Sequence, residues 1–271
     1  ISPNVYCINH RIKLNTIETN ELDTFDPYLE GWNYRKTITI NNNLVVGEHS
    51  NFPILLNIVD NDLIYNTELN GEDIIFMNDK GTAERLFHEI EFFQRSSGKL
   101  VAWINIPILS KNTTSIIYMY YGNQNFVNQD NPSMVWDSDY IAVYHMTDLK
   151  DSTGKYNLTS IGATSDPSGK IGSCYDLESS EEDYIAQGEL LDTFPDNITI
   201  EVWFSIESSK EQSILSKINS EIDYFSFDVL ENNDLRFSGK GKDNFWIHHF
   251  GNINNLNIFY YSAVICEKNQ Q

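Results

Sequence analysis

Alternation of apolar and polar residues with a period of two runs through most of the chain and predicts β-strands. Residues 197–207 (NITIEVWFSIE) show the pattern most clearly, because Val202 and Phe204 fall on one face and Glu201 and Trp203 on the other. No segment has helical periodicity over more than about two turns. The pattern therefore predicts an all-β protein.

Turn residues divide this pattern into separate strands. Asn232 with Asn233 predicts a tight hairpin, because Asn tolerates a left-handed backbone conformation. In the first half the predicted strands are RKTITIN (35–41), FPILLNIV (52–59), EDIIFMND (72–79), RLFHEIEFF (85–93), KLVAWINIP (99–107) and TSIIYMYYGN (114–123). In the second half they include DYIAVYHMT (139–147), residues 197–207, QSILSKI (212–218), YFSFDVLE (224–231), DLRFSGK (234–240), FWIHHF (245–250) and IFYYSAVICEK (258–268).

A polar stretch near the middle of the chain, NQNFVNQDNPS (123–133), interrupts the strands and predicts a linker. With 271 residues, the chain has the length of two modules of ordinary size. We therefore expect an N-terminal arm (1–31) in which residues 5–14 can form one strand, a first β-sandwich (32–126), a linker (127–135) and a second β-sandwich (136–271).

The charge of the chain limits its partners. The sequence has 39 acidic and 18 basic side chains, a formal net charge of −21, which repels phosphate backbones and anionic lipid surfaces. We therefore expect no nucleic-acid partner. No run of about 18 apolar residues predicts a membrane span, and the segment after Ile1 has neither the basic start nor the apolar run of a signal peptide. If the protein is exported, we expect its signal to have been removed.

Five ordered blocks stand out in the first module. They are Trp32, Tyr34, Arg35, Ile38 and Ile40 at the start, Gly71, Asp73, Ile74 and Phe76 in NGEDIIF, Glu89 and Glu91 in HEIE, Trp103 in AWINIP, and Tyr120 to Asn123 in YYGN. These blocks resemble the domain family DUF2341, whose function is not established. That resemblance implies a module of large bacterial and archaeal surface proteins.

The second module contains, in order, Trp136, Tyr144 and His145 in WDSDYIAVYHM, the DSTG turn from Asp151 to Gly154, GKIGSCYD (169–176) and ITIEVWFSI (198–206). Blocks in this order resemble a laminin-G-like, concanavalin A-like jelly roll. Such jelly rolls usually continue beyond the strand that matches residues 258–268. We therefore expect the second module to be incomplete at its C-terminal end, with the chain stopping at Gln271.

The sharpest catalytic candidate is Glu89-Ile90-Glu91, because residues two apart on a strand face the same side and can hold two carboxylates about 7 Å apart. The pattern resembles the E-x-D-x-x-E signature of jelly-roll β-glucanases, but Gln94 stands where the general acid is needed and cannot supply a proton. We expect a solvated strand face instead, with Ile90 and Phe92 opposite. Since no other catalytic motif is present, the sequence predicts that the protein is not an enzyme.

Calcium is the cofactor that the sequence favours, since laminin-G-like folds commonly bind one calcium ion through loop carboxylates and carbonyls. The candidate ligands are Asp148, Asp151 and Asp176, although Asp-Ser-Thr-Gly is also an ordinary turn.

A carbohydrate site is the other candidate. Trp246 has the exposed aromatic character of such sites, with Asn244 and His248 nearby, although a tryptophan in a sandwich is more often core. The neighbouring His248 and His249 point to opposite faces of a strand and cannot share a metal.

The cysteines and the glycosylation sequons indicate whether the protein lies inside or outside the cell. A disulfide between Cys174 and Cys266 is expected in an oxidising compartment, and the alternative is that these two residues and Cys7 are buried thiols. Sequons at Asn112, Asn157 and Asn197 permit N-glycosylation outside a cell. Together with the two resemblances, these features predict an extracellular or cell-surface protein of a prokaryote.

Three hypotheses about function follow. The first is a non-catalytic extracellular surface protein, an adhesive module that binds a surface glycan or a protein. The second is a structural subunit of a cell-surface filament or layer, in which the strand-forming arm before residue 32 pairs with an exposed sheet edge of its own chain or of a neighbouring copy. The third is a pair of accessory domains of a secreted glycoside hydrolase.

Overall fold

The computed structural model of the chain describes residues 5–8, 26–78, 84–111, 114–188, 197–218, 224–240 and 245–267. The chain divides into two compact units, unit 1 (Ile1–Gln187) and unit 2 (Gly188–Gln271). The strands of both units pair antiparallel and form sandwiched sheets, which confirms the predicted all-β class. No helix in the described part of the chain has the length and apolar character that crossing a bilayer requires.

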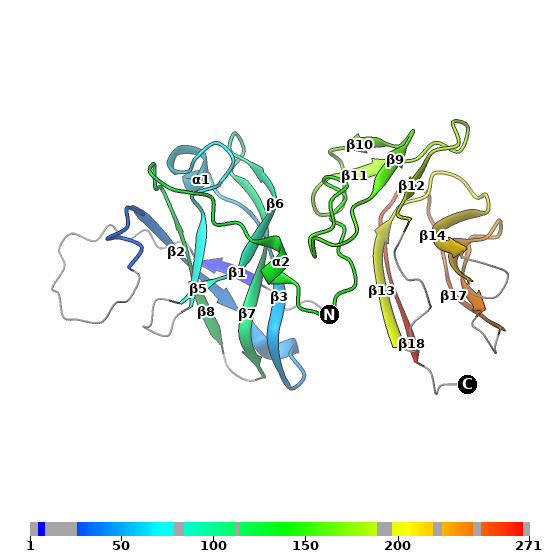
Figure 1. Ribbon diagram of the computed structural model, residues 1–271, viewed down its shortest axis with the longest axis horizontal. Coiled ribbons are helices and arrows are strands. Elements are labelled where there is room, and N and C mark those ends of the chain that lie inside the picture. Colours follow the sequence, from blue (N-terminus) through cyan, green and yellow to red (C-terminus); the bar gives the residue numbers. More distant parts are fainter. Residues whose placement is uncertain are drawn as a thin grey trace. The chain divides into compact units, whose positions relative to one another are not determined.

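Unit 1 is a β-sandwich with two facing sheets (Figure 1). One sheet has the strand order β1-β2-β8-β4-β5, and the other has the order β3-β7-β6. The strands of the five-stranded sheet are β1 (Val5–Ile8), β2 (Tyr34–Ile40), β4 (Ile75–Asn78), β5 (Arg85–Leu86) and β8 (Ser115–Tyr121), and those of the three-stranded sheet are β3 (Glu48–Val59), β6 (His88–Gln94) and β7 (Lys99–Ser110). The other elements described in unit 1 are η1 (Asn42–Leu44), α1 (Asn61–Asn66), α2 (Pro132–Val135), β9 (Thr159–Ile161), β10 (Thr164–Asp166), β11 (Cys174–Asp176) and β12 (Tyr184–Ala186).

The core of unit 1 lies between the two sheets and follows from the predicted alternation. Ile38 and Ile40 of β2 and Leu100 and Ile104 of β7 are fully buried in one cluster. The predicted strand 85–93 is divided at Phe87, so that β5 joins one sheet and β6 the other. One strand-like run of sequence therefore connects the two layers.

An ion pair closes one side of this core. Lys36 lies on the inward face of β2, the same face as Ile38 and Ile40. Although it is charged, it is buried like these two isoleucines. Its ammonium group pairs with Asp60, which caps α1 after β3, and lies 3.5 Å from Asp62. Because each sheet supplies one partner, the pair ties the two layers together where the apolar core ends.

Three of the five blocks that resemble the DUF2341 family meet at Asp73, which is fully buried. Its carboxylate accepts hydrogen bonds from the backbone N–H groups of Glu68 (2.9 Å), Gly122 (2.6 Å) and Asn123 (3.3 Å). The indole of Trp32 donates to the Asp73 carbonyl at 2.6 Å. The first, second and last blocks are therefore joined by hydrogen bonds to one residue, which gives them a structural role.

The N-terminal arm contributes β1, which pairs with β2 at the edge of the five-stranded sheet in the register Val5 to Ile40 and Cys7 to Ile38. This strand lies within the predicted segment 5–14, of which residues 9–14 are outside the described part of the chain. Of the two pairings expected for the arm, the structure contains the one with its own chain.

The predicted linker (127–135) does not connect two separate bodies, and the unit boundary does not follow it. Asn131 donates its backbone N–H to the carbonyl of His88 at 2.9 Å, and Val135 is fully buried. Residues 139–147, predicted as a strand, have irregular structure instead. Residues 130–157, called the covering segment below, belong to unit 1 because they pack against the outer face of β6 and β7. The contacts that bury Asn105, Glu89 and Glu91 under this segment are the physical reason.

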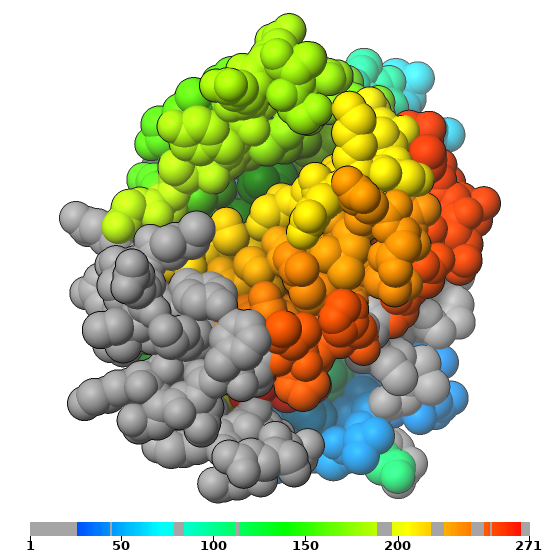
Figure 2. Space-filling view, turned by 90° about the vertical axis from the view of Figure 1, so that its right-hand side faces the viewer, coloured from blue at the N-terminus to red at the C-terminus, as the bar shows by residue number. Residues whose placement is uncertain are grey.

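Unit 2 has a sheet of two strands, β13 and β18, and a sheet of four strands in the order β14-β15-β16-β17. Its strands are β13 (Asn197–Phe204), β14 (Gln212–Ile218), β15 (Tyr224–Val229), β16 (Asp234–Lys240), β17 (Phe245–Asn252) and β18 (Tyr260–Glu267), and Figure 2 shows β14 to β17 in yellow to orange. Val202 and Phe204 pack against a core that contains Phe227, as the alternation predicts. Asn233 has a φ of 64° in the turn between β15 and β16, which confirms the predicted hairpin.

We expect replacement of Asp73 to destabilise unit 1. Asp73→Ala leaves three backbone N–H groups without their acceptor, so the free energy of unfolding should fall by about 3 kcal/mol or more. Asp73→Asn keeps one acceptor oxygen and should lose less. Urea denaturation followed by tryptophan fluorescence measures both, and the exposed neighbour Glu72 gives the control Glu72→Ala, which should change stability by under about 0.5 kcal/mol. Equal losses for Asp73→Ala and Glu72→Ala would contradict the structural role of Asp73.

Candidate functional site

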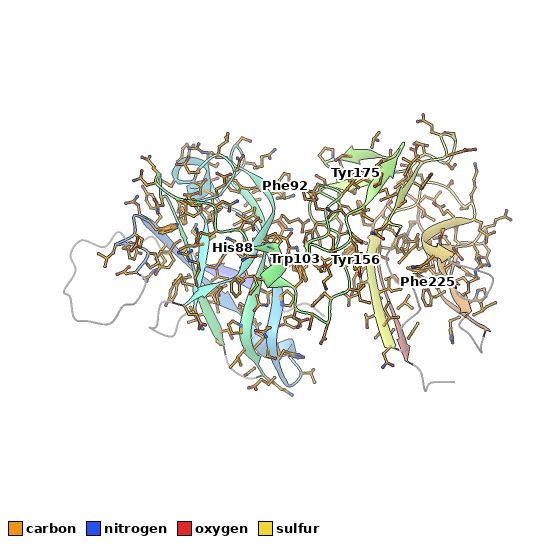
Figure 3. All side chains as sticks on the ribbon, in the orientation of Figure 1. His88, Phe92, Trp103, Tyr156, Tyr175 and Phe225 are labelled. Atoms are coloured by element: carbon orange, nitrogen blue, oxygen red, sulfur yellow. The ribbon has the colours of Figure 1, made fainter. Side chains whose placement is uncertain are left out.

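A bulge in β6 places two carboxylates on the outer face of the three-stranded sheet. Glu89 pairs with Trp103, whereas Phe92 pairs with Val101, so the register shifts between Ile90 and Phe92. Glu89 and Glu91 share one face, as predicted from their spacing. Phe92 is predicted to lie opposite the two carboxylates, but it lies on their face, because the bulge adds one residue to β6. His88, one residue before the pair, points inward and packs against Phe76 (Figure 3).

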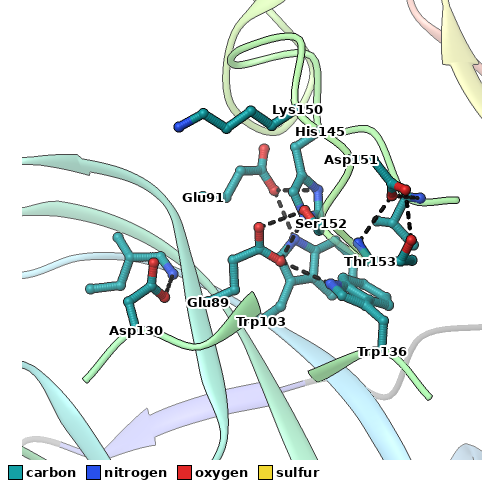
Figure 4. Close-up of polar contacts among 12 residues, drawn as sticks. Glu89, Glu91, Trp103, Asp130, Trp136, His145, Lys150, Asp151, Ser152 and Thr153 are labelled. Carbon is teal, nitrogen blue, oxygen red and sulfur yellow. Dashed lines mark hydrogen bonds and ion pairs between the residues drawn. The ribbon is translucent and has the colours of Figure 1, made fainter. Parts of the chain in front are cut away.

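The covering segment buries both carboxylates (Figure 4). Glu89 accepts hydrogen bonds from the indole of Trp136 at 2.8 Å and the hydroxyl of Ser152 at 2.6 Å. Glu91 accepts one from the indole of Trp103 at 2.8 Å. The side chain of Glu91 is 2% exposed and that of Glu89 is 10% exposed. The expectation of a solvated face is therefore wrong, because the residues that cover it come some fifty positions later in the chain.

His145 lies between the two carboxylates. Its Nε2 is 3.1 Å from Oε2 of Glu89, and its Nδ1 is 3.3 Å from Oε2 of Glu91. The ring stacks on Trp103, with centroids 5.6 Å apart and planes at 20°, and contacts Trp136 at 5.7 Å. When the ring is protonated it carries a positive charge beside both carboxylates, and the aromatic faces attract that charge.

The pKa of His145 follows from this geometry. Burial by itself lowers the pKa, but the hydrogen bond to Glu89 and the charges of Glu89 and Glu91 outweigh burial and raise it above its ordinary value. His88 shows the opposite case, since burial without a carboxylate lowers its pKa to about 4. The two histidines therefore differ in charge near pH 6: His88 is neutral and His145 is protonated.

The carboxylates around His145 are shifted in different directions. Burial opposes ionisation of Glu89, but the hydrogen bond and charge of His145 and the bonds from Ser152 and Trp136 lower its pKa. Burial dominates for Glu91 and raises its pKa despite His145 and Trp103. Asp130 lies nearby, with its carboxylate accepting from the backbone N–H of Ile90 at 2.9 Å, and burial raises the pKa of Asp130 to about 6.

Asp151 shapes the covering segment next to this cluster. Its carboxylate accepts from the backbone N–H groups of Val143, Thr153, Lys155 and Tyr156 and from the hydroxyl of Thr153. These bonds hold the turn that brings Ser152 to Glu89. Burial and the charge of Asp151 raise the pKa of Tyr144 to about 12, and its hydroxyl donates to the Tyr156 carbonyl at 2.6 Å.

The cluster pairs its buried charges. Both nitrogens of His145 lie against carboxylates in this arrangement. This matching of charges and donors makes burial of two carboxylates tolerable. The cluster ties the covering segment to the sandwich.

The structure does not bring the three predicted calcium ligands together. Within the described ranges, no three His, Cys, Asp or Glu side chains form a group that could hold a metal. Asp151 is occupied by the donors of its own turn, and Asp148 is exposed and accepts from the backbone of Lys150. Asp176 lies on β11, paired with Thr164. Calcium binding stays a prediction.

The predicted carbohydrate residues are described only in part. Asn244 and the side chain of Trp246 lie outside the described residues. His248 lies on β17 opposite Phe237 and is exposed, as is His249. A sugar site at these residues stays a prediction.

The predicted disulfide would join the two units. Cys174 lies on β11 of unit 1 and Cys266 on β18 of unit 2, and both are half-buried free thiols. A disulfide between them stays a prediction. Burial raises the pKa of both thiols. Of the sequons, Asn157 and Asn197 are exposed, and Asn112 lies outside the described residues. Glycosylation of these residues stays a prediction.

Comparison with known proteins identifies a family for part of unit 1. Residues 70–157 match the model of a family described as a domain of unknown function (DUF2341). The resemblance inferred from the sequence blocks is therefore confirmed over these residues, and the match continues beyond Phe126 through the covering segment. No curated protein and no solved structure matches the chain.

The sequence blocks that contain the partners of Glu89 and Glu91 resemble the second module, although the residues belong to the first. Trp136 and His145 lie in WDSDYIAVYHM and Ser152 in DSTG, the blocks that resemble the start of a jelly roll. The structure and the family match both place them with the first module. A signal was available: the pair of carboxylates on an otherwise apolar strand needs donors, and these blocks supply an indole, an imidazole and a hydroxyl.

We expect His145→Gln to lower stability in a pH-dependent way. The raised pKa means that the charged ring stabilises the fold fully below its unfolded value, about 6.5, and that this contribution is lost as the pH rises through the folded-state pKa. The stability difference between wild type and variant should therefore be about 3 kcal/mol near pH 6 and should narrow towards pH 9. Urea denaturation across this range measures it. The exposed His49 supplies the control His49→Gln, and a difference that grows with pH would contradict the ion pairs.

We expect Gly172→Ala to disturb Glu91. A Cβ atom at Gly172 would lie 2.6 Å from Oε1 of Glu91 and 2.9 Å from Oγ1 of Thr147, so the carboxylate, which also accepts from Trp103, must shift. Overpacking of this kind costs about 1–3 kcal/mol. The near-ultraviolet circular dichroism of the tryptophans should change together with the unfolding midpoint. Gly188→Ala is the matched control, since a Cβ there meets nothing within 4 Å, and identical spectra for both variants would contradict the packing at Gly172.

Proposed function

We propose that this chain is a non-catalytic, extracellular surface protein that binds a glycan through unit 2. The observation that carries the proposal is a pair of exposed aromatic side chains on the outer face of the two-stranded sheet. Trp203 of β13 is 41% exposed and Tyr261 of β18 is 50% exposed. The two residues are opposite each other in the register, with ring centroids 5.2 Å apart.

Polar groups accompany this aromatic pair, which we call the Trp203–Tyr261 platform. Glu201 lies two residues before Trp203 on the same face and hydrogen-bonds to Tyr261; burial and Glu201 together raise the pKa of Tyr261. Thr199 continues the same exposed face of β13. Sugar rings present an apolar C–H face to aromatic rings and hydroxyl groups to polar neighbours, and a platform with both features suits them.

The non-catalytic part of the proposal is supported by unit 1. Glu89 and Glu91, the carboxylates whose spacing resembles that of a glycosidase, are buried and hydrogen-bonded to the covering segment. The nearby His145 uses both ring nitrogens in the same cluster. These side chains serve the packing of unit 1.

A glycan array tests the proposal. The full chain should bind a restricted set of glycans, and Trp203→Ala or Tyr261→Ala should weaken the strongest signal about tenfold or more, since a stacked aromatic side chain is a typical binding hot spot. Titration calorimetry with the selected glycan measures the change in Kd.

Tyr65 of unit 1 provides the matched control, because it is 77% exposed. Tyr65→Ala should leave the Kd unchanged. If the chain binds no glycan selectively, the proposed function fails. If binding is selective but unaffected by Trp203→Ala and Tyr261→Ala, the platform is not the site.

A further inference from the structure

The first strand of the chain occupies a sheet edge that another chain could also fill. β1 pairs with β2, and β2 pairs on its other side with β8, so β1 is the outermost strand of the five-stranded sheet. Without β1, the backbone N–H and C=O groups along one side of β2 have no strand partner. Unpaired strand edges of this kind readily accept a strand from another molecule.

We propose that β1 of one chain pairs with β2 of a second copy of this chain, so that copies are joined by exchange of their N-terminal strands. The exchanged strand makes the same antiparallel ladder and the same register as within one chain. The proposal concerns self-association through unit 1 and goes beyond glycan binding by unit 2.

The length of the connection between β1 and β2 permits exchange. Residues 9–33 separate the two strands, whereas antiparallel neighbours in a hairpin are usually joined by two to five residues. A connection of this length reaches about 80 Å when extended. β1 can therefore reach β2 of a neighbouring copy, which competes with its own β2 when copies are held at about millimolar local concentration.

The register shows what the exchanged strand must supply. Val5 is opposite Ile40 and Cys7 is opposite Ile38, and both isoleucines are fully buried in the core of the sandwich. β1 also contacts β3, the edge strand of the other sheet. The strand thus closes the side of the sandwich at which the two sheets meet. A vacant edge would leave this side of the core open, which makes pairing with a second copy favourable.

Charge complementarity points to the same partner. Residues 1–15 contain Arg11 and Lys13 and no acidic residue, whereas the whole chain has a formal net charge of −21. Two copies of so acidic a chain repel each other over most of their surfaces. Residues 1–15 are therefore attracted to the acidic body of a neighbour and offset part of this repulsion, whereas residues 16–31 of the arm are acidic. The segment that contains β1 is suited in charge to a second copy.

Intermolecular cross-linking tests the exchange directly. Donor chains keep Cys7 and Ile38, and acceptor chains carry Cys7→Ser with Ile38→Cys; both also carry Cys174→Ser and Cys266→Ser. The two are produced together in one cell with different affinity tags, purified over both tags and oxidised with oxidised glutathione. A disulfide between the cysteines at positions 7 and 38 can then form only between two chains.

The proposal predicts a covalent donor–acceptor dimer on a non-reducing gel, which reducing agent dissolves. An acceptor with Thr39→Cys in place of Ile38→Cys is the register control, since Thr39 is opposite Tyr6, and it should cross-link at least fivefold less. A single chain with both Cys7 and Ile38→Cys should also cross-link, which establishes that the register is correct. An internal cross-link in that chain together with no donor–acceptor dimer overturns the exchange.

A second pair keeps the test decisive if Ile38→Cys fails to fold, because Ile38 is fully buried. Donors with Tyr6→Cys and acceptors with Thr39→Cys, both in a Cys7→Ser background, use the neighbouring position of the same ladder, where Thr39 is half-buried. Absence of cross-linking with both pairs overturns the proposal. Glycan binding through Trp203 is measured separately, so the two proposals can fail independently.

Discussion

The fold of unit 1 depends on the burial of two carboxylates. Glu89 and Glu91 project from the outer face of a sheet, where they would cost nothing if water reached them. Once covered, each needs donors, since an unpaired buried charge is among the costliest defects in a protein interior. Trp103, Trp136, Ser152 and His145 supply those donors, and three of the four come from the covering segment. The requirement to pair these charges therefore decides which part of the chain packs where.

The local structure could be predicted from the sequence wherever short-range chemistry determines it. Alternation of side chains fixes which face of β13 is buried, and the conformational tolerance of Asn233 fixes the hairpin between β15 and β16. The shared face of Glu89 and Glu91 follows from the geometry of a strand. Its burial does not follow from local geometry, because the covering residues are distant in sequence.

The polar stretch after β8 shows why composition alone does not locate the boundary between two modules. Asn and Asp are frequent in linkers because they are soluble, but they are also frequent where side chains accept from nearby backbone N–H groups. Here Asn123 accepts from Asn125, and Asn128 accepts from Asp130. The segment is a series of turns that runs over the sandwich, with Asp130 bound to the backbone of Ile90. Polarity alone does not distinguish the two cases.

The covering segment follows the strands of the sandwich in sequence, and this order limits how the module can be exchanged between genes. A gene fragment that ended after the last strand of the sandwich, at Tyr121, would encode Glu89 and Glu91 without His145, Trp136 or Ser152. In such a fragment, the two carboxylates would lack the hydrogen-bond donors and the imidazole that pair with them in the full module. Recombination that preserves the fold must therefore transfer the strands and the covering segment together. Residues 70–157, the range that matches the family, contain all of these residues.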